Sequence, residues 1–288
     1  MPELPEVETV RRGLSNLIIG RTIKSVIHDT AKSFPNDDQT VKSFMIQAKV
    51  SGVRRRAKVL MIDLSTSYTL VVHLKMTGQL VYVGETRFGA GHPSDSLVNQ
   101  LPDKSTRVVI EFTDHTNLYF NDQRKFGWIK LVPTAEISEM AFMKKVGPEP
   151  LEDTFTPAQF AERFKRRANT SIKAALLDQS VIAGVGNIYA DESLWGAKIH
   201  PKRLVKTIKP AEFKKLYIEL RSVMNLAIEK GGSSNHTYIN AEGKKGSYMD
   251  FARVFRREGL ACPRCGTTII KIRVAGRGTH ICPHCQRL

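Results

Sequence analysis

The four cysteines of the chain are confined to its last 27 residues, where they form two C-x-x-C pairs. Cys262 and Cys265 are followed, after sixteen residues, by Cys282 and Cys285. Two such pairs allow four thiolates to surround one zinc ion in tetrahedral geometry. Because four protein ligands leave no open position, the spacing predicts one structural zinc ion. A redox pair or plain core cysteines are the weaker alternatives.

The N-terminal stretch MPELPEVETV offers a second kind of chemistry, with two prolines and three glutamates within eight residues. If processing removes Met1, Pro2 supplies a secondary amine, whose condensation with a carbonyl carbon gives an electron-withdrawing iminium. α-Amino groups titrate at about 8, so part of such an amine is unprotonated near neutrality. A helix N-terminus lowers that value further. A solvated helix start without chemical meaning is the alternative interpretation.

The first 18 residues predict an amphipathic helix, because apolar side chains recur at spacings of three and four. Prolines are tolerated in a first helical turn, where the N–H groups have no helical partner. Glu3 is the acid nearest to Pro2, although the helix dipole favours its carboxylate and a general acid needs a proton. Glu6 is interpreted as a helix-start charge, with a proton relay as the alternative. The apolar positions are Leu4, Val7, Val10, Leu14 and Leu17.

The chain is strongly basic, since Lys and Arg outnumber Asp and Glu by 44 to 28 and the formal net charge is +16. Such an excess favours a polyanionic partner, above all nucleic acid. A generally basic protein, or one that touches anionic lipid, is the alternative. No apolar run approaches the ~18–20 residues of a membrane span, and the N-terminus lacks a signal-peptide pattern. We therefore expect a cytoplasmic protein.

Strand patterns dominate the chain as far as residue 132, and helical patterns follow after residue 150. Short β-branched and aromatic segments such as KVLMIDLS, YTLVVHLKM and RVVIEF predict a sandwich or flattened barrel. The polar stretch 84–105 is interpreted as a long, mobile surface loop, and 133–150 as a connection between domains. The helical part includes TPAQFAERFKRR, capped by Thr156, and PAEFKKLYIELRSVMNLAIEK, the longest predicted helix.

Two glycine-containing turns are suited to phosphate. Asn187, after Gly184-Val185-Gly186, is a good N-cap for a helix start that binds phosphate through backbone N–H groups. A dinucleotide fold is disfavoured, because Tyr189 stands at the third glycine position. Between the cysteine pairs, a hairpin with the tip 275–278 presents Arg277, whose guanidinium suits bidentate phosphate contact. An ordinary surface arginine is an equal alternative there.

Four separated features together resemble the bacterial formamidopyrimidine-DNA glycosylase family, the base-excision enzymes for oxidised purines. They are MPELPEVETVRRGL, RRRAKVL, GVGNIYADESLW and the four-cysteine finger with its GRGT tip, which cover essentially the whole chain in the family's order. The resemblance implies an α+β multidomain protein. It has an N-terminal β-sandwich with an N-terminal helix (1–132), a linker (133–150), a helix-two-turns-helix domain (151–256) with a lesion-contacting loop (233–250), and a C-terminal zinc-finger β-hairpin (257–288).

The resemblance also implies residue roles. Met1 is removed, Pro2 is the Schiff-base nucleophile, and Glu3 is the proton donor that assists opening of the sugar ring. Lys58 contacts the nucleotide and donates a proton for β-elimination, while Arg277 contacts phosphate and donates one for δ-elimination. Asn187 and Arg277 hold the phosphates that flank the everted nucleotide. The further DNA-contacting residues are Lys173 and the three that fill the gap left by the flipped base, Met76, Arg124 and Phe126.

Two departures from the family pattern stand out. The chain reads NDQRKFG where the family often has an Asp-Pro-Arg-Arg-Phe-Gly sequence, and residues 103–107 lack a histidine-rich form. The implied partner is double-stranded damaged DNA. The resemblance implies that no protein partner is required and that no membrane takes part, and a monomer associated with the nucleoid is expected. The alternatives are an endonuclease VIII-type glycosylase for oxidised pyrimidines and a non-catalytic zinc-finger protein that binds nucleic acid.

Overall fold

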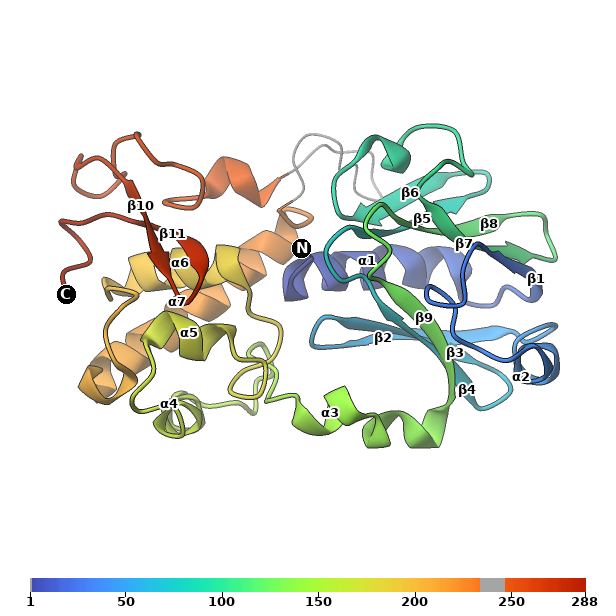
Figure 1. Cartoon of the computed structure of the whole chain (residues 1–288), viewed down its shortest axis with the longest axis horizontal. Helices are drawn as coiled ribbons and strands as arrows, with labels where there is room; N and C mark the ends of the chain where they lie inside the picture. Colours follow the sequence, from blue (N-terminus) through green and yellow to red (C-terminus); the bar gives the residue numbers. More distant parts are fainter. Residues whose placement is uncertain (1, 234–246) are drawn as a thin grey trace. The chain divides into compact units, whose positions relative to one another are not determined.

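The computed structural model describes residues 2–233 and 247–288, which form two compact units (Figure 1). The first unit contains Met1–Lys144 and Lys230–Ser247, and the second contains Lys145–Glu229 and Tyr248–Leu288. The loop predicted at 233–250 falls mainly on residues 234–246, which lie outside the described residues. Among the described residues, no helix is long and apolar enough to cross a membrane.

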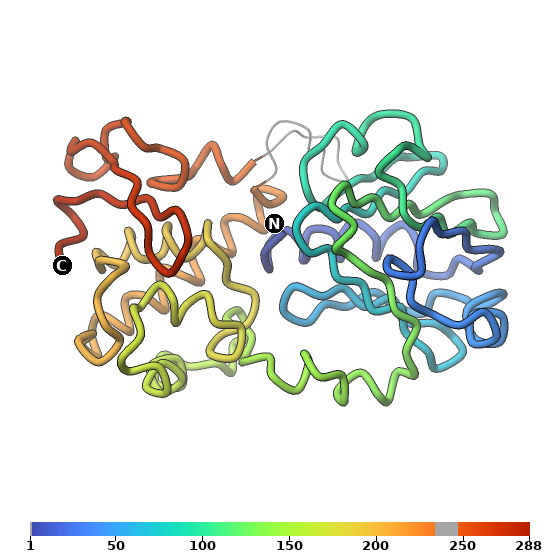
Figure 2. Tube along the Cα trace, in the orientation of Figure 1, coloured from blue at the N-terminus to red at the C-terminus, as the bar shows by residue number. Residues whose placement is uncertain are grey.

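The first unit is a β-sandwich of two antiparallel sheets with a long N-terminal helix, as the sequence predicts. The five-stranded sheet, in the order β1-β7-β8-β5-β6, comprises β1 (Ile23–His28), β5 (Gly78–Val83), β6 (Arg87–Gly91), β7 (Thr106–Phe112) and β8 (Asn117–Asp122). The four-stranded sheet, in the order β2-β3-β4-β9, comprises β2 (Val50–Arg56), β3 (Val59–Leu64), β4 (Tyr68–His73) and β9 (Trp128–Pro133). In Figure 2, β9 returns along β4, its antiparallel partner.

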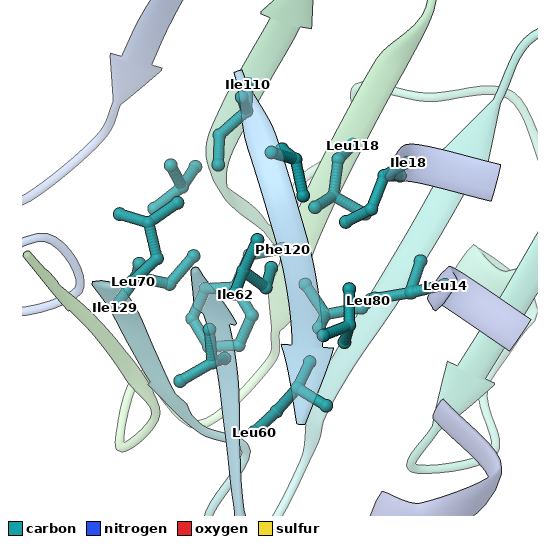
Figure 3. Close-up of a cluster of buried hydrophobic side chains, with 14 of the residues drawn as sticks. Leu14, Ile18, Leu60, Ile62, Leu70, Leu80, Ile110, Leu118, Phe120 and Ile129 are labelled. Atoms are coloured by element: carbon teal, nitrogen blue, oxygen red, sulfur yellow. The ribbon is translucent and has the colours of Figure 1, made fainter. Parts of the chain in front are cut away.

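Helix α1 (Leu4–Ile18) is fixed by the core of the sandwich. Leu14 and Ile18 lie among the side chains of the two sheets, such as Leu60 from β3 and Phe120 from β8 (Figure 3). Each fully buried leucine or isoleucine contributes roughly 1.5–3 kcal/mol to stability. The predicted apolar stripe is correct except at its end, where Ile18 is fully buried and Leu17 only partly. The core therefore holds the helix, and with it the N-terminal residues, in one position.

Residues 134–145 cover the outer face of the four-stranded sheet. They form the 3-10 helix η2 (Thr134–Glu139) and the short helix α3 (Ala141–Lys145). Ile137 is buried against Val59 and Val71, with Phe142 packed beside them. This part of the stretch predicted as a linker thus contributes a small apolar layer of its own.

The interpretation of 84–105 as a long irregular loop is wrong for its first half. Strand β6 lies there and pairs with β5, which buries Phe88 and Ala90 on the core side. The following 3-10 helix η1 (Asp95–Leu97) packs Leu97 against Val81 on the outer face. A strand of five residues, three of them small, gives too short an alternation of apolar and polar side chains to be predicted. The strand forms because β5 offers a free edge of the sheet for pairing.

The second unit is helical and ends in a two-stranded hairpin. An aromatic cluster that includes Phe160, Phe164 and Tyr217 holds α4 against α7. Helix α6 is buried on nearly its whole circumference, so it lies inside the unit. The elements are α4 (Pro157–Lys165), α5 (Ile172–Leu177), α6 (Asn187–Ala197), η3 (Val205–Thr207), α7 (Pro210–Glu229), η4 (Tyr248–Phe251), β10 (Ile270–Val274) and β11 (Arg277–Ile281). Helix α2 (Asp38–Phe44) completes the first unit.

Two local predictions in the second unit need correction. The N-cap of α6 is Gly186, whose backbone is extended, and Asn187 is the first helical residue. The Asn187 amide donates to the carbonyl of Gly278 at 3.0 Å. The hairpin turn is Ala275-Gly276 alone, with φ of 50° and 73°, so Arg277 already belongs to β11. Two central residues with positive φ match the right-handed twist of a tight hairpin.

Candidate active site

Pro2 and Glu3 stand directly before α1, where a capping box encloses the chain terminus. The Glu3 carboxylate accepts from the N–H of Glu6, and the N–H of Glu3 donates to Glu6 Oε2 at 2.7 Å. Pro2 is buried and Glu3 is 3% exposed. The N–H donor favours the carboxylate form of Glu3, whereas burial favours the acid form. The two reactive candidates are therefore adjacent and held by the helix start.

Glu6 is an anchor between this helix start and a distant segment of the same unit. Its second oxygen, Oε1, accepts from the N–H of Ser233 at 2.8 Å, and the residue is 4% exposed. The backbone of Gly232, at φ +90°, passes close to the Glu6 side chain. A Cβ at position 232 would lie only 3.2 Å from Glu6 Cγ, so glycine suits this position. With N–H donors on both oxygens, Glu6 serves as an acceptor that fixes backbone, which favours a structural role over a proton relay.

Lys58 lies in the tight turn between β2 and β3, and its residue is 8% exposed. His73, at the end of β4, pairs with Val59 next to it. Burial first, and then the charges of Lys75 and Lys58, lower the pKa of His73 to about 3. Its Nδ1 accepts from the N–H of Lys75 at 3.1 Å, so the neutral ring carries its proton on Nε2.

Sequence reasoning did not single out His73, although it stands in the same HLKM stretch as Met76. A neutral imidazole with Nε2–H is a hydrogen-bond donor, and Lys58 is near enough for its charge to act on the ring. His73 comes close to Lys58 because β4 pairs with β3, which begins directly after Lys58. No local sequence pattern reveals this pairing.

Met76, Arg124 and Phe126 come from two neighbouring turns of the first unit. Met76 lies between β4 and β5, while Arg124 and Phe126 lie between β8 and β9. The Arg124 guanidinium is 4.8 Å from the centroid of the Phe126 ring, and Lys32 Nζ is 5.3 Å from the same centroid. Phe126 is 43% exposed and so is not a core residue. The structure thus gathers an exposed ring and its cations at one place.

Lys173 is completely buried in the second unit and does not present its ammonium to solvent. Its Nζ donates to Asp191 Oδ1 at 2.6 Å and to Thr279 Oγ1 at 2.7 Å. Asp191 Oδ2 in turn accepts from the N–H of His280 at 2.9 Å. Lys173 therefore ties α5 to α6 and to strand β11. In this arrangement it supports the hairpin, which differs from the direct DNA contact expected from the sequence.

Arg277 stays exposed at the start of β11, one residue from the carbonyl that holds Asn187. The Lys173 ammonium also reaches that carbonyl of Gly278, at 3.4 Å. One backbone carbonyl is thus shared by two donors from different helices. The two phosphate-binding candidates, Asn187 and Arg277, are brought together by this link.

The four cysteine sulfurs lie within 4.8 Å of one another. Zn–S bonds of about 2.3 Å place thiolates about 3.8 Å apart in a tetrahedron, so the spacing suits zinc. Burial raises the pKa of Cys282 to about 12, whereas hydrogen bonds with Thr267 lower the pKa of Cys265 to about 5. Without a cation the cluster does not ionise as a whole, and a divalent metal is the partner that makes four thiolates stable together.

Trp195 on α6 connects this cluster to the helices. Its indole Nε1–H donates to Cys262 Sγ at 3.4 Å. The Arg264 guanidinium stacks 3.9 Å from the indole centroid and donates to the Trp195 carbonyl at 3.0 Å. The finger is therefore seated on the C-terminal end of α6, where cations and donors are favoured by the helix carbonyls.

Three family models match successive parts of the chain. They are the formamidopyrimidine-DNA glycosylase N-terminal domain at residues 1–129, the formamidopyrimidine-DNA glycosylase H2TH domain at 146–238, and the zinc finger found in FPG and IleRS at 259–288. The predicted zinc ion is confirmed as one structural ion by the zinc-finger match together with the four-cysteine cluster.

Relatives match over the whole length. A formamidopyrimidine-DNA glycosylase from Pediococcus pentosaceus is 41% identical over 288 residues, covering 100% of both chains. The solved complex between the Lactococcus lactis Fpg and DNA containing an abasic site has a TM-score of 0.87 at 34% identity, covering 99% of this chain and 100% of that one. The MutM (FPG) protein of Thermus thermophilus has a TM-score of 0.83 at 37% identity, with 99% and 98% covered. The chain therefore belongs to the formamidopyrimidine-DNA glycosylase family.

Proposed function

We propose that the chain is a bifunctional DNA glycosylase and abasic-site lyase of base excision repair, which removes oxidised purines such as 8-oxoguanine and formamidopyrimidines. The observation that carries the proposal is the enclosed helix start, where Pro2 directly precedes the Glu3–Glu6 capping box. Family membership supports the substrate class, and the Lactococcus lactis relative bound to abasic-site DNA supports DNA as the partner.

The proposed reaction begins when the Pro2 amine attacks C1′ of the damaged nucleotide. The N–C1′ bond forms, the glycosidic bond breaks, and the base leaves with a proton. Glu3 protonates the ring oxygen as the sugar opens, and the iminium at C1′ acidifies the hydrogen on C2′. Loss of that proton expels the 3′ phosphate, and a second elimination expels the 5′ phosphate. We assign the proton donations in these two eliminations to Lys58 and Arg277.

The position of Pro2 favours the unprotonated amine that this attack requires. The amine lies at the positive end of the α1 dipole and in a buried site, and both disfavour an ammonium. A terminal amine starts from a pKa of about 8, lower than that of a lysine at about 10.4. Both effects therefore act in the direction that enlarges the unprotonated fraction of the amine.

Phosphate contacts are proposed on both units. Lys58 and His73 supply two donors on the first unit, while Asn187 and Arg277 supply an amide and a guanidinium on the second. We propose that Lys173 acts behind the latter pair as an internal support. The net charge of +16 provides the general attraction to duplex DNA. We further propose a monomer without an obligatory protein partner, acting in the cytoplasm on nucleoid DNA.

Trapping with borohydride on duplex DNA that carries an abasic site or 8-oxoguanine tests the nucleophile. Wild-type protein is expected to give a covalent adduct, because reduction fixes the iminium, whereas Pro2→Gly is expected to lose it. Pro5→Gly is the matched control, since Pro5 lies in the same first turn but is not terminal. Intact mass shows whether Met1 has been removed. Absence of an adduct with the wild type, or equal trapping by Pro2→Gly, contradicts the proposal.

A further inference from the structure

Asp122, the last residue of β8, is a completely buried carboxylate of the first unit that the proposed chemistry does not use. A buried charge is expensive unless several donors compensate it. Its surroundings supply four. Asp122 Oδ2 accepts from the N–H groups of Phe126 at 2.8 Å and Gly127 at 2.7 Å. Asp122 Oδ1 accepts from the N–H of Arg124 at 3.1 Å and from the Thr77 hydroxyl.

These four donors belong to two turns that are separate in sequence. Three of them are backbone groups of the turn 123–127, which carries Arg124 and Phe126, and the fourth is next to Met76 in the turn 74–77. Thr77 Oγ1 also accepts from the N–H of Arg124 at 3.0 Å. The Thr77 hydroxyl therefore donates to the Asp122 carboxylate and accepts from the backbone of the turn 123–127. The two turns are thereby joined through one hydroxyl and one carboxylate.

Both turns contain a lysine in the left-handed region just before a wedge candidate. Lys75 has φ 50° and precedes Met76, and Lys125 has φ 55° and precedes Phe126. A non-glycine residue in this region carries roughly 1–2 kcal/mol of steric strain. Such turns persist only where surrounding bonds determine the backbone. The Asp122 bonds constrain the backbone of the turn that carries Phe126. The Thr77 hydroxyl ties the turn of Met76 to it, and within that turn the N–H of Lys75 also donates to His73 Nδ1.

Asp122 is itself fixed from behind. Arg107, 7% exposed, donates from Nε to the Asp122 carbonyl at 2.8 Å and from a terminal nitrogen to the Lys104 carbonyl at 2.6 Å. The N–H of Asp122 donates to the Ser105 carbonyl at 2.8 Å. The carboxylate thus projects from a backbone held on both sides, so the two turns are attached to a rigid point of the sheet.

We propose that Asp122 and Thr77 are positioning residues that hold Met76, Arg124 and Phe126 as one preformed wedge. This inference rests on the proposed function, in which the wedge fills the space of the everted nucleotide. Unstacking a base costs a few kcal/mol, which the inserted side chains repay only when they are already oriented. A loosened wedge therefore impairs removal of a paired, stacked lesion more than cleavage at an abasic site, where no base is displaced.

The test compares two activities of the same full-length variants. Thr77→Val keeps the shape of the side chain and removes the hydroxyl, and Asp122→Asn replaces one acceptor oxygen by a donor that faces N–H groups. Rates are measured under single-turnover conditions for 8-oxoguanine excision and for strand cleavage at an abasic site. Asp114→Asn is the control, because Asp114 accepts from the N–H of Thr116 at 3.1 Å in a turn that carries no wedge residue.

The excision-to-cleavage ratio is expected to fall about tenfold or more in both variants, which corresponds to about 1.4 kcal/mol. The double variant is expected to resemble the worse single one, since both changes break one link. An unchanged ratio, including an equal loss of both activities, overturns the inference. If Asp122→Asn does not fold, Thr77→Val alone decides. If the wild type shows neither activity, the proposed function fails instead.

Discussion

Glu3 has two tasks at the start of α1, because it caps the helix and is also the proposed acid. The capping box shows how both fit one side chain, since the Glu6 N–H uses only one acceptor position of the carboxyl group. A protonated carboxyl group can accept that bond and still carry a proton. The conflict between the helix dipole and a general acid, evident from the sequence, thus sets burial, which favours the acid form, against the helix dipole and the Glu6 N–H, which favour the carboxylate.

His73 makes a residue-scale prediction for stability. Its pKa of about 3 in the folded chain lies below the usual value of about 6.5, so between these values the unfolded chain binds a proton that the folded chain does not. Stability is therefore lost as the pH falls from about 6.5 towards 3. At pH 5 this amounts to about 2 kcal/mol relative to neutral pH.

Denaturant unfolding of the wild type and His73→Gln at pH 7 and pH 5 measures this contribution. The variant cannot titrate in this window and is expected to lose about 2 kcal/mol less between the two pH values. His115→Gln is the control, because His115 is exposed in a turn of the same unit. An identical decrease in wild type and His73→Gln contradicts the prediction.

At the scale of elements, the tie between α5, α6 and β11 decides how the hairpin is held. Lys173→Met leaves Asp191 buried without its counter-charge, which costs roughly 3–5 kcal/mol in comparable sites. The free energy of unfolding is expected to fall by that order, and Lys173→Met combined with Asp191→Asn to recover part of it. DNA affinity is expected to fall because the Gly278 carbonyl loses one of its two donors.

The salt dependence of DNA binding separates this support from direct phosphate contact. Each phosphate contact contributes about 0.9 to the slope of log affinity against log salt. Lys173→Met is expected to leave the slope unchanged, whereas Arg277→Met is expected to lower it by about one contact. A decrease in slope for Lys173→Met shows that its ammonium reaches DNA.

Local patterns predicted those elements whose cause is local. The apolar stripe from Leu4 to Leu14 depends on α1 alone, and the cap at Thr156 depends on α4 alone. The cysteine spacing depends only on the segment around one hairpin. Each of these features could therefore be predicted from the local sequence. Strand β6 and the candidate site residue His73 were missed because each depends on a neighbouring strand. The DNA contact that the resemblance implies for Lys173 stays a prediction. Its buried partners lie on the next helix and on β11, which no local pattern reveals.

At the scale of the whole molecule, the zinc cluster supports the folded hairpin and so the proposed phosphate site. Cys265→Ser is expected to lose the metal and DNA binding together. A finger this small depends on the metal ion for its folding, because its own apolar core is too small to hold it. Zinc content by elemental analysis and affinity for an abasic-site duplex measure the two effects. Ser180→Ala is a control outside the finger. If a metal-free variant binds DNA with unchanged affinity, the zinc finger does not contribute to DNA binding and the prediction is wrong.

The chain has two tryptophans, and each unit contains one of them. Trp128 begins β9 in the first unit, while Trp195 in the second contacts a cysteine sulfur through its indole N–H. Trp128→Phe and Trp195→Phe thus yield two proteins in which tryptophan fluorescence comes from one half only. Emission from Trp195 is expected to change with metal loading, because its indole N–H donates to Cys262, one of the four cysteines of the cluster. Tryptophan emission of these two variants therefore reports the unfolding of each unit separately, and shows whether the two units unfold in sequence or together.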